Sequence, residues 1–180
     1  KLGDTVLVVG GGPMDNLIAQ CAAHAGAATI VVSEPLALRR ELAQAHGATH
    51  VIDPGRQDVA KELKAIRRIG ADVVFEAAGN NAAQAACIPL ARKGGTVMFF
   101  GVSPQDRLIQ VNPFVINENE LKVLGSFNNQ FATARAVQLL ASGAVRVGKL
   151  ISHTLALKQY LDVFRLFGGR DTMKLMVTME

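Results

Sequence analysis

The residues with the clearest chemical potential form a glycine-rich turn near the amino terminus. Gly10 and Gly12 directly follow the apolar run TVLVV, and Pro13 suits the first turn of a helix. A turn between a strand and a helix lets backbone N–H groups face a pyrophosphate, whose charge the helix dipole favours. The first two glycines of the G-x-G-x-x-G pattern are present, but Asp15 stands at the third. The turn therefore predicts a dinucleotide site with one acidic departure.

A carboxylate at the expected distance strengthens this interpretation. Glu34 ends the apolar run in VVSEP, about 20 residues beyond the turn, where an acid can bind both hydroxyls of the adenosine ribose. An ionised carboxylate and a 2′-phosphate would repel by about 1 to 4 kcal/mol, so NAD is expected in preference to NADP. The alternative from the residues alone is a flavodoxin-like or methyltransferase-like sheet with an incidental glycine turn.

Asp15 is expected to suit the helix better than the ligand. As the third helical residue, its carboxylate favours the helix dipole by about 0.3 to 1 kcal/mol. At about 5 to 8 Å from a bound pyrophosphate, the same charge costs about 1 to 3 kcal/mol. We expect a folded domain whose NAD affinity is weakened roughly ten- to a hundredfold and is largely recovered by Asp15→Gly.

A sheet must position these residues, and the chain supplies one. Continuous apolar runs alternate with helical stretches of about ten residues, which is typical of a parallel sheet buried on both faces. We expect an α/β fold, a Rossmann-type doubly wound parallel sheet of order 3-2-1-4-5-6. The expected strands are 5–9, 29–32, 50–52, 72–76, 96–100 and 121–127. The expected helices of this part are 13–25, 36–46, 59–69, 81–91 and 131–141.

The region after Gly101 fits a symmetric nucleotide fold less well. A further strand is expected at 108–111, before a polar stretch that leads to the last strand of the sheet. The tail offers strands at 150–155 and 174–179 around a helix at 157–167. We divide the chain into a nucleotide-binding domain, residues 1–145, and a C-terminal segment, residues 146–180, that packs against something else.

Composition excludes several other classes of protein. The 180 residues are 49% hydrophobic and 19% charged, which excludes intrinsic disorder, and two cysteines cannot form a disulfide framework. A reducing, cytoplasmic location is expected, with no membrane span. The net charge of +4 comes from dispersed basic residues, and one Tyr without Trp offers little for base stacking, so no nucleic-acid partner is expected. His24, His46 and His50 lie near the ends of expected elements and are predicted to be surface residues.

Several segments together resemble a known family. They are GDTVLVVGGGPM, VVSEP, GATHVIDP, GADVVFEAAG, KGGTVMFFGV and LKVLGSF. In this order they resemble the cofactor domain of the medium-chain dehydrogenase/reductase family, and are most similar to its zinc-dependent alcohol, polyol (sorbitol) and threonine dehydrogenases. The resemblance implies an oxidoreductase that transfers a hydride between the nicotinamide of NAD(H) and an alcohol or carbonyl carbon.

The resemblance also implies which residues bind the cofactor. The residues of the pyrophosphate turn are Gly10, Gly12, Pro13 and Met14. The residues beside the adenosine ribose are Glu34, Arg39, Ala78 and Gly79. The residues that flank the nicotinamide are Gly101, Val102, Phe127 and Asn128.

The family catalyses with a zinc ion held by a second domain, so no catalytic or metal-binding residue is expected in this chain, and the chain alone is expected to be inactive. The tail is expected to return to that absent catalytic domain, with exposed apolar residues facing it. These residues are Leu155, Tyr160, Leu161, Phe164 and Phe167. Strand 121–127 is expected to form a homodimer. Two alternatives stay open: an NADPH-dependent quinone or enoyl reductase domain of the same family, and a non-catalytic nucleotide-binding paralogue, for which Asp15 is the main argument.

Overall fold

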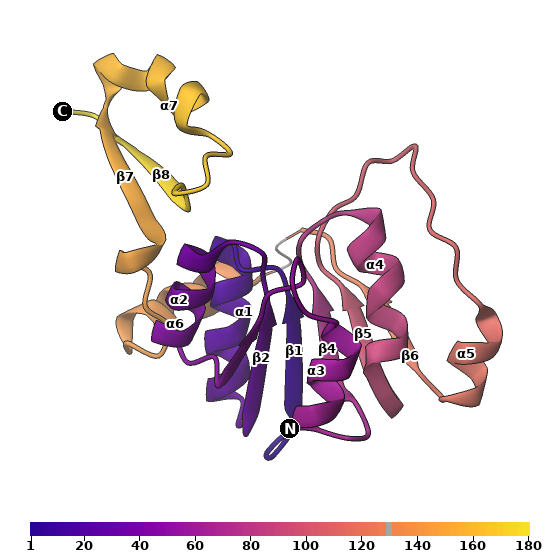
Figure 1. The fold of residues 1–180 in the computed structure, drawn as a ribbon. Coiled ribbons are helices and arrows are strands. Elements are labelled where there is room, and N and C mark those ends of the chain that lie inside the picture. Colours follow the sequence, from indigo (N-terminus) through magenta and orange to yellow (C-terminus); the bar gives the residue numbers. More distant parts are fainter. Residues whose placement is uncertain (129–130) are drawn as a thin grey trace.

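A six-stranded parallel sheet forms the centre of the molecule in the computed structural model, which describes residues 1–128 and 131–180. Its order is β3-β2-β1-β4-β5-β6, as predicted for a Rossmann-type doubly wound fold (Figure 1). Every neighbouring pair is parallel. The strands are β1 (Thr5–Val9), β2 (Thr29–Ser33), β3 (His50–Ile52), β4 (Ala71–Glu76), β5 (Ala91–Phe99) and β6 (Lys122–Gly125).

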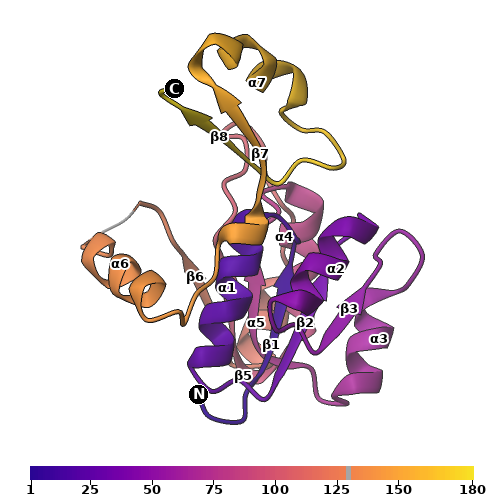
Figure 2. The same ribbon diagram turned by 90° about the vertical axis from the view of Figure 1, so that its left-hand side faces the viewer.

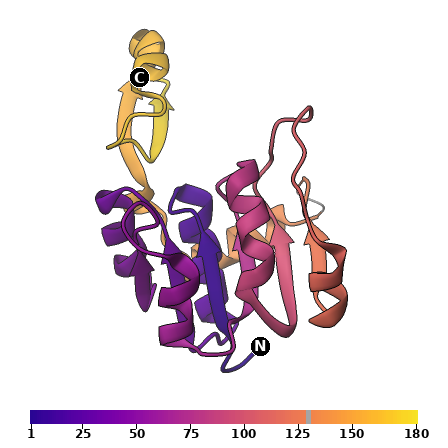
Figure 3. The same ribbon diagram turned by 45° about the vertical axis from the view of Figure 1, so that its right-hand side comes forward.

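Helices cover both faces of this sheet, which explains why its central strands carry apolar residues on both faces. On one face, α1 (Pro13–His24) and α2 (Ala37–Ala45) pack on the side chains of Val6, Val8, Ile30 and Val32. On the other face lie α3 (Val59–Ile66) and α4 (Asn81–Cys87) (Figure 3). Both helices contribute to a second apolar cluster. The residues of that second cluster include Leu7, Val31, Val74, Val97, Leu63 and Cys87. The two clusters fix these parallel strands so that the carboxyl ends of β1, β2 and β4 lie side by side at the same end of the sheet.

The loop after β5 differs from the prediction. Residues 108–111 do not form a strand, and Leu108 is almost fully exposed, because β6 already pairs with β5 along that edge of the sheet. The helix α5 (Pro113–Glu118) was not predicted. It begins where the Asn112 side chain accepts a hydrogen bond from the backbone N–H of Phe114, so Asn-Pro here caps a helix rather than only making a turn.

The last two strands of the sheet also have boundaries other than those expected. β5 begins at Ala91 and shifts register around Gly94 and Gly95, so helix α4 and a short 3₁₀ turn end before Ala91. β6 ends at Gly125, which places Phe127 outside the strand predicted for 121–127.

Residues 148–180 form an arm that stands off from the main sheet (Figures 1 and 2). It contains β7 (Ile151–Ala156) and β8 (Lys174–Thr178), which pair in parallel, and α7 (Tyr160–Leu166). At its base Leu150 is buried, and the Gln20 side chain of α1 makes two hydrogen bonds to the backbone of Arg146, at 2.7 and 3.0 Å. The arm is therefore attached through α1, the helix that follows the glycine turn.

Four of the five apolar tail residues are exposed, as predicted, and Leu155 is half-buried. The exposed ones are Tyr160, Leu161, Phe164 and Phe167. The rings of Tyr160 and Phe164 pack edge to face with their centroids 5.5 Å apart, so they form one patch. Helix α6 (Thr133–Ala141) is exposed along its length as well.

Among the described residues, no helix combines the length and the hydropathy needed to cross a bilayer.

Candidate dinucleotide-binding site

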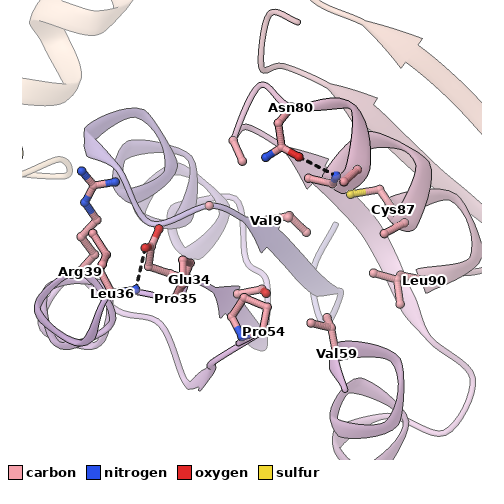
Figure 4. Close-up of a pocket in the computed structure, with 16 residues that line it drawn as sticks. Val9, Glu34, Pro35, Leu36, Arg39, Pro54, Val59, Asn80, Cys87 and Leu90 are labelled. Carbon is pink, nitrogen blue, oxygen red and sulfur yellow. Dashed lines mark hydrogen bonds between the residues drawn. The ribbon is translucent and has the colours of Figure 1, made fainter. Parts of the chain in front are cut away.

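A cavity of about 610 Å³ opens at the carboxyl ends of β1 and β2 (Figure 4). Four predicted residues line it: Gly10 of the turn, Glu34 at the end of β2, Arg39 of α2 and Ala78 after β4. Ligands of doubly wound sheets bind at this place, where the strand order reverses. Tertiary structure therefore gathers one set of predicted residues into a single cavity.

The opposite wall of this cavity was not predicted, and it is mainly apolar. It is lined by Pro54, Val59, Ala82, Ala83, Ala86, Cys87 and Leu90, with Asn80 at the start of α4. Burial raises the pKa of the Cys87 thiol to about 12, with a further contribution from Glu76. The thiol is therefore protonated at neutral pH and forms part of a wall suited to a flat, weakly polar group.

The glycines of the turn are required by close contacts. Gly10 has a φ of +123°, and a Cβ there would collide with the Asp15 carboxylate and lie 3.3 Å from the backbone nitrogen of Ala78. A Cβ at Gly11 would overlap the side chain of Glu34. Gly11 stands at a variable position of the motif, so sequence reasoning had no signal for its requirement. The turn leaves backbone close to the cavity, as an approaching pyrophosphate needs.

Glu34 is held in place within the wall of the cavity. Its carboxylate Oε1 accepts a hydrogen bond of 2.9 Å from the backbone N–H of Leu36 (Figure 4). Its backbone oxygen accepts one of 2.7 Å from Arg40. Its side chain is buried, and its second oxygen, Oε2, lies beside Gly11. A fixed carboxylate next to the turn can accept hydrogen bonds from ribose hydroxyls without first losing much rotamer entropy.

Arg39 joins the cavity to the arm. Its Nη2 donates a hydrogen bond of 3.1 Å to the backbone oxygen of Thr172, while its Nε is buried and has no hydrogen-bond partner among the described residues. Arg39 also lines a second cavity of about 750 Å³ between α1 and the arm, with Pro13 and Met14. The guanidinium group thus lies at the boundary of the two cavities with donors that Thr172 does not use, Nε among them.

Asp15 turns its side chain back beneath the turn. The residue is only 5% exposed, and its Oδ1 lies against Gly10 with no hydrogen-bond partner among the described residues. Burial raises the pKa of this carboxyl to about 6, against the opposing effect of backbone hydrogen bonding at residues 15 and 12. Repulsion from Glu34 and Glu76 raises the pKa further. Sequence spacing placed Asp15 near the turn, but its burial depends on tertiary packing.

Glu76 is a site residue that sequence reasoning missed. It is 0% exposed at the end of β4, and its Oε1 accepts a hydrogen bond of 2.8 Å from the backbone N–H of Gly79. The residue ends the apolar run DVVFE as Glu34 ends VVSE, and that parallel was the available signal. Through this bond Glu76 fixes the loop that carries Ala78 and Gly79.

Sequence reasoning also missed Asn16 and His46, which together support the backbone of the glycine turn. Asn16 is 1% exposed, and its Nδ2 donates hydrogen bonds of 2.9 Å to the backbone oxygens of both Gly11 and Gly12. Its Oδ1 lies 3.1 Å from Nδ1 of His46, which must then be the protonated nitrogen of that ring. His46 was predicted to be at the surface, but it is buried against α1. Burial, together with the charges of Arg146 and Lys149, lowers its pKa and keeps the ring neutral near pH 7.

The remaining predicted residues lie outside the first cavity. Gly79 and Gly101 pack closely together, and Val102 lies beside them with an exposed side chain. Phe127, 72% exposed, and Asn128, with a φ of +71°, line neither the first nor the second cavity. Of the predicted residues, the first cavity thus takes in Gly10, Glu34, Arg39 and Ala78, and the second takes in Pro13, Met14 and Arg39.

Within residues 1–128 and 131–180, no group of three or more His, Cys, Asp or Glu side chains is arranged to hold a metal ion.

Known proteins are similar to this chain in sequence and in fold. The sorbitol dehydrogenase of Bacillus subtilis (strain 168) is 33% identical over 178 residues, 97% of this chain and 50% of that protein. The L-threonine 3-dehydrogenase of Pyrococcus horikoshii is 31% identical over 182 residues, 99% of this chain and 52% of that protein. The chain thus spans about half the length of the curated relatives it matches.

A solved structure agrees with these relatives. A protein from Sinorhizobium meliloti 1021, assigned to the zinc-binding dehydrogenases and solved bound to NADP, superimposes with a TM-score of 0.95. It is 38% identical, and the match covers 98% of this chain and 53% of that one. A family profile described as zinc-binding dehydrogenase matches residues 14–142. The predicted resemblance is confirmed, and the chain belongs to the zinc-binding dehydrogenase family.

Proposed function

We propose that this chain is the NAD(H)-binding half of a zinc-dependent alcohol or polyol dehydrogenase. The observation that carries the proposal is the buried carboxylate of Glu34 in the wall of a cavity that begins at the glycine turn. Sorbitol and threonine dehydrogenases among the relatives support an alcohol as the substrate class. When bound, the nicotinamide supplies hydride exchange with an alcohol or carbonyl carbon.

The residues of this chain bind and orient the cofactor in this proposal. The turn of Gly10, Gly12, Pro13 and Met14 holds the pyrophosphate through backbone N–H groups, helped by the dipole of α1, while Pro13, which has no N–H, begins that helix. Glu34 and Arg39 hold the adenosine ribose, and Ala78 and Gly79 close its other side. Gly101, Val102, Phe127 and Asn128 approach the nicotinamide from the loops after β5 and β6. Packing against Asp15 and Glu34 excludes a Cβ at Gly10 and Gly11, and such a group can approach backbone that carries no Cβ closely.

We propose NAD rather than NADP because of Glu34. A 2′-phosphate on the adenosine ribose would meet the carboxylate at close range, at a cost of about 1 to 4 kcal/mol. NADP remains the second candidate, favoured by the bound NADP of the Sinorhizobium protein and by the free Nε of Arg39. Calorimetric titration should give NAD⁺ a Kd severalfold to several-hundredfold below that of NADP⁺, and Glu34→Gln should narrow the ratio. Equal or tighter binding of NADP⁺ by the unaltered chain contradicts the proposal.

Zinc and substrate belong to the other half of such enzymes in this proposal. Open catalytic zinc sites use three protein ligands at one point, and the described residues gather no such group. We infer that residues 1–145 bind the cofactor and that the segment 146–180 packs against the catalytic half through the exposed patch of Tyr160, Leu161, Phe164 and Phe167. The chain alone is therefore expected to bind NAD(H) without oxidising an alcohol. Undetectable NADH binding would contradict the proposal, and tight NADPH binding would favour a quinone or enoyl reductase.

A further inference from the structure

Three buried carboxylates surround the glycine turn from three elements. Asp15 lies in the first turn of α1, Glu34 at the end of β2, and Glu76 at the end of β4. One oxygen of Asp15 and one of Glu76 have no hydrogen-bond partner among the described residues. Glu34 and Glu76 each accept a backbone hydrogen bond, and repulsion from these two carboxylates acts on Asp15, for which no cationic side chain compensates among the described residues.

We propose that binding of a dinucleotide takes up one proton from solvent at the Asp15 carboxylate, so that this residue sets the pH dependence of cofactor affinity. The inference rests on the proposed function, because it assumes that a diphosphate binds at the turn. Above neutral pH, the Asp15 carboxyl is then ionised in the free protein and protonated in the complex with the dinucleotide, so it controls the affinity for the cofactor.

Geometry is the first support for this proposal. Asp15 Oδ1 lies against Gly10, and Oδ2 is 3.0 Å from the Cβ position of Gly12, so the carboxyl group touches both glycines of the motif. A diphosphate held by the backbone of that turn brings two further negative charges to the same few ångströms. The site is shielded from water, so this repulsion is weakly screened. A protonated carboxyl removes the repulsion and can donate a hydrogen bond to a phosphate oxygen.

The charged side chains that act on Asp15 all raise its pKa. Glu34 acts from β2 and Glu76 from β4, and no basic side chain of the described residues is among the groups that shift it. Only backbone groups at residues 12 and 15 favour the ionised form. With a pKa of about 6 in the free protein, Asp15 is mostly ionised at pH 7.5 and about half protonated at pH 6. It is therefore poised to change charge within the physiological range when an anion arrives.

The sign of the pH effect follows from linkage. The diphosphate raises the pKa of Asp15 above its free value, so the complex holds more protons than the free protein between these two pKa values. In that interval affinity increases as pH falls, by at most about tenfold per pH unit for one proton. Below about pH 6 the carboxyl is largely protonated in both states, and affinity becomes independent of pH.

The experiment is calorimetric titration of the whole 180-residue chain with NAD⁺ from pH 6 to 8.5, in two non-phosphate buffers of low and high ionisation enthalpy. The difference between the two buffers gives the number of protons taken up, and needs no variant. We expect uptake of up to about one proton near pH 7.5, and a Kd that rises between pH 6.5 and 8.

Asp15→Asn is the matched variant, since it keeps the shape and removes the charge. It should bind NAD⁺ roughly ten- to a hundredfold more tightly than the unaltered chain at pH 8, but within about threefold at pH 6, and without proton uptake. Glu41→Gln removes an exposed carboxylate of α2 and should leave the pH dependence unchanged. Proton uptake near zero in the unaltered chain, or uptake retained in Asp15→Asn, overturns the inference but not the proposed function. Absence of binding in both chains at every pH overturns both.

Discussion

At the scale of single residues, Asn16 connects the glycine turn to the rest of the fold. Both hydrogens of its amide go to carbonyl oxygens of the turn, and His46 of the α2 cap satisfies its oxygen. The turn has left-handed and extended backbone, and this buried amide holds it together with a backbone hydrogen bond of 2.9 Å from Gly10 to Ser33. A preorganised turn binds an anion with less loss of entropy than a mobile one.

Asn16→Leu should therefore affect both stability and ligand binding. We expect the free energy of unfolding to fall by about 1 to 3 kcal/mol, because two carbonyls and the His46 nitrogen lose a buried partner. The Kd for NADH should rise about three- to thirtyfold, measured by fluorescence titration beside urea unfolding. His46→Asn, whose amide can replace Nδ1 as a donor, should retain most of the NADH affinity. A loss of stability with unchanged affinity in Asn16→Leu would show that the turn does not depend on this amide.

At the scale of elements, Asp72 joins three strands at the amino end of the sheet. From β4 it accepts a hydrogen bond of 2.7 Å from the backbone of Thr5 in β1, and it pairs with Arg92 of β5 and with Arg67 after α3. Burial alone would raise the pKa of Asp72, but the Thr5 hydrogen bond and the two arginines hold it below its usual value. The carboxylate therefore stabilises the native state in its ionised form.

Asp72→Asn should cost about 2 to 4 kcal/mol of unfolding free energy at pH 7, since it leaves two partly buried arginines without their counter-charge. Because the folded pKa is depressed, the stabilisation is complete above the unfolded pKa of about 3.9 and is lost as pH falls through the folded value. Urea unfolding at pH 7 and pH 3 should show a smaller difference between variant and parent at pH 3. Asp162→Asn removes an exposed i,i+3 pair with Arg165 and should change stability by less than about 0.5 kcal/mol. A similar cost for both variants at pH 7 would argue against this role for Asp72.

At the scale of the whole molecule, β6 leaves one edge of the sheet open. β6 pairs only with β5 among the described strands, and three of its four residues are exposed. An open edge of this kind can pair with the same edge of a second copy about a twofold axis. We expect a homodimer built in this way. The described residues beside the edge include the exposed Leu124 and Phe127, which such a contact would cover.

Sedimentation velocity at tens of micromolar should therefore give the mass of a dimer. Leu124→Asp should shift the population toward monomer, because it places a charge in the contact while Leu124 is already 47% exposed in the single chain. Its unfolding free energy per chain at high dilution should be nearly that of the parent. Phe164→Ser is the control, because Phe164 is exposed on the arm, and this substitution should leave the dimer intact. A parent chain that sediments as a monomer contradicts this assembly.

The local features that the sequence predicted correctly are those whose cause lies within a few neighbouring residues. Continuous apolar runs mark β1, β2 and β4, and the glycine turn is marked by its own residue types. The strand predicted at 108–111 was wrong because pairing is decided by which edge is free, and β6 occupies that edge. His46 was misplaced for a similar reason, since its burial comes from α1 packing beside it, not from its position at a helix end.

The sequence by itself determined the strand order, the glycine turn and the acid at the end of β2, because right-handed βαβ crossovers with buried parallel strands leave few other arrangements. Only the tertiary structure decided what surrounds the turn. It brought Glu76 to the turn from β4 and His46 to Asn16 from the end of α2, and it buried the Asp15 carboxylate near those of Glu34 and Glu76. Desolvation and charge repulsion depend on distances in space, so the change in the pKa of Asp15 follows from packing that sequence spacing does not contain.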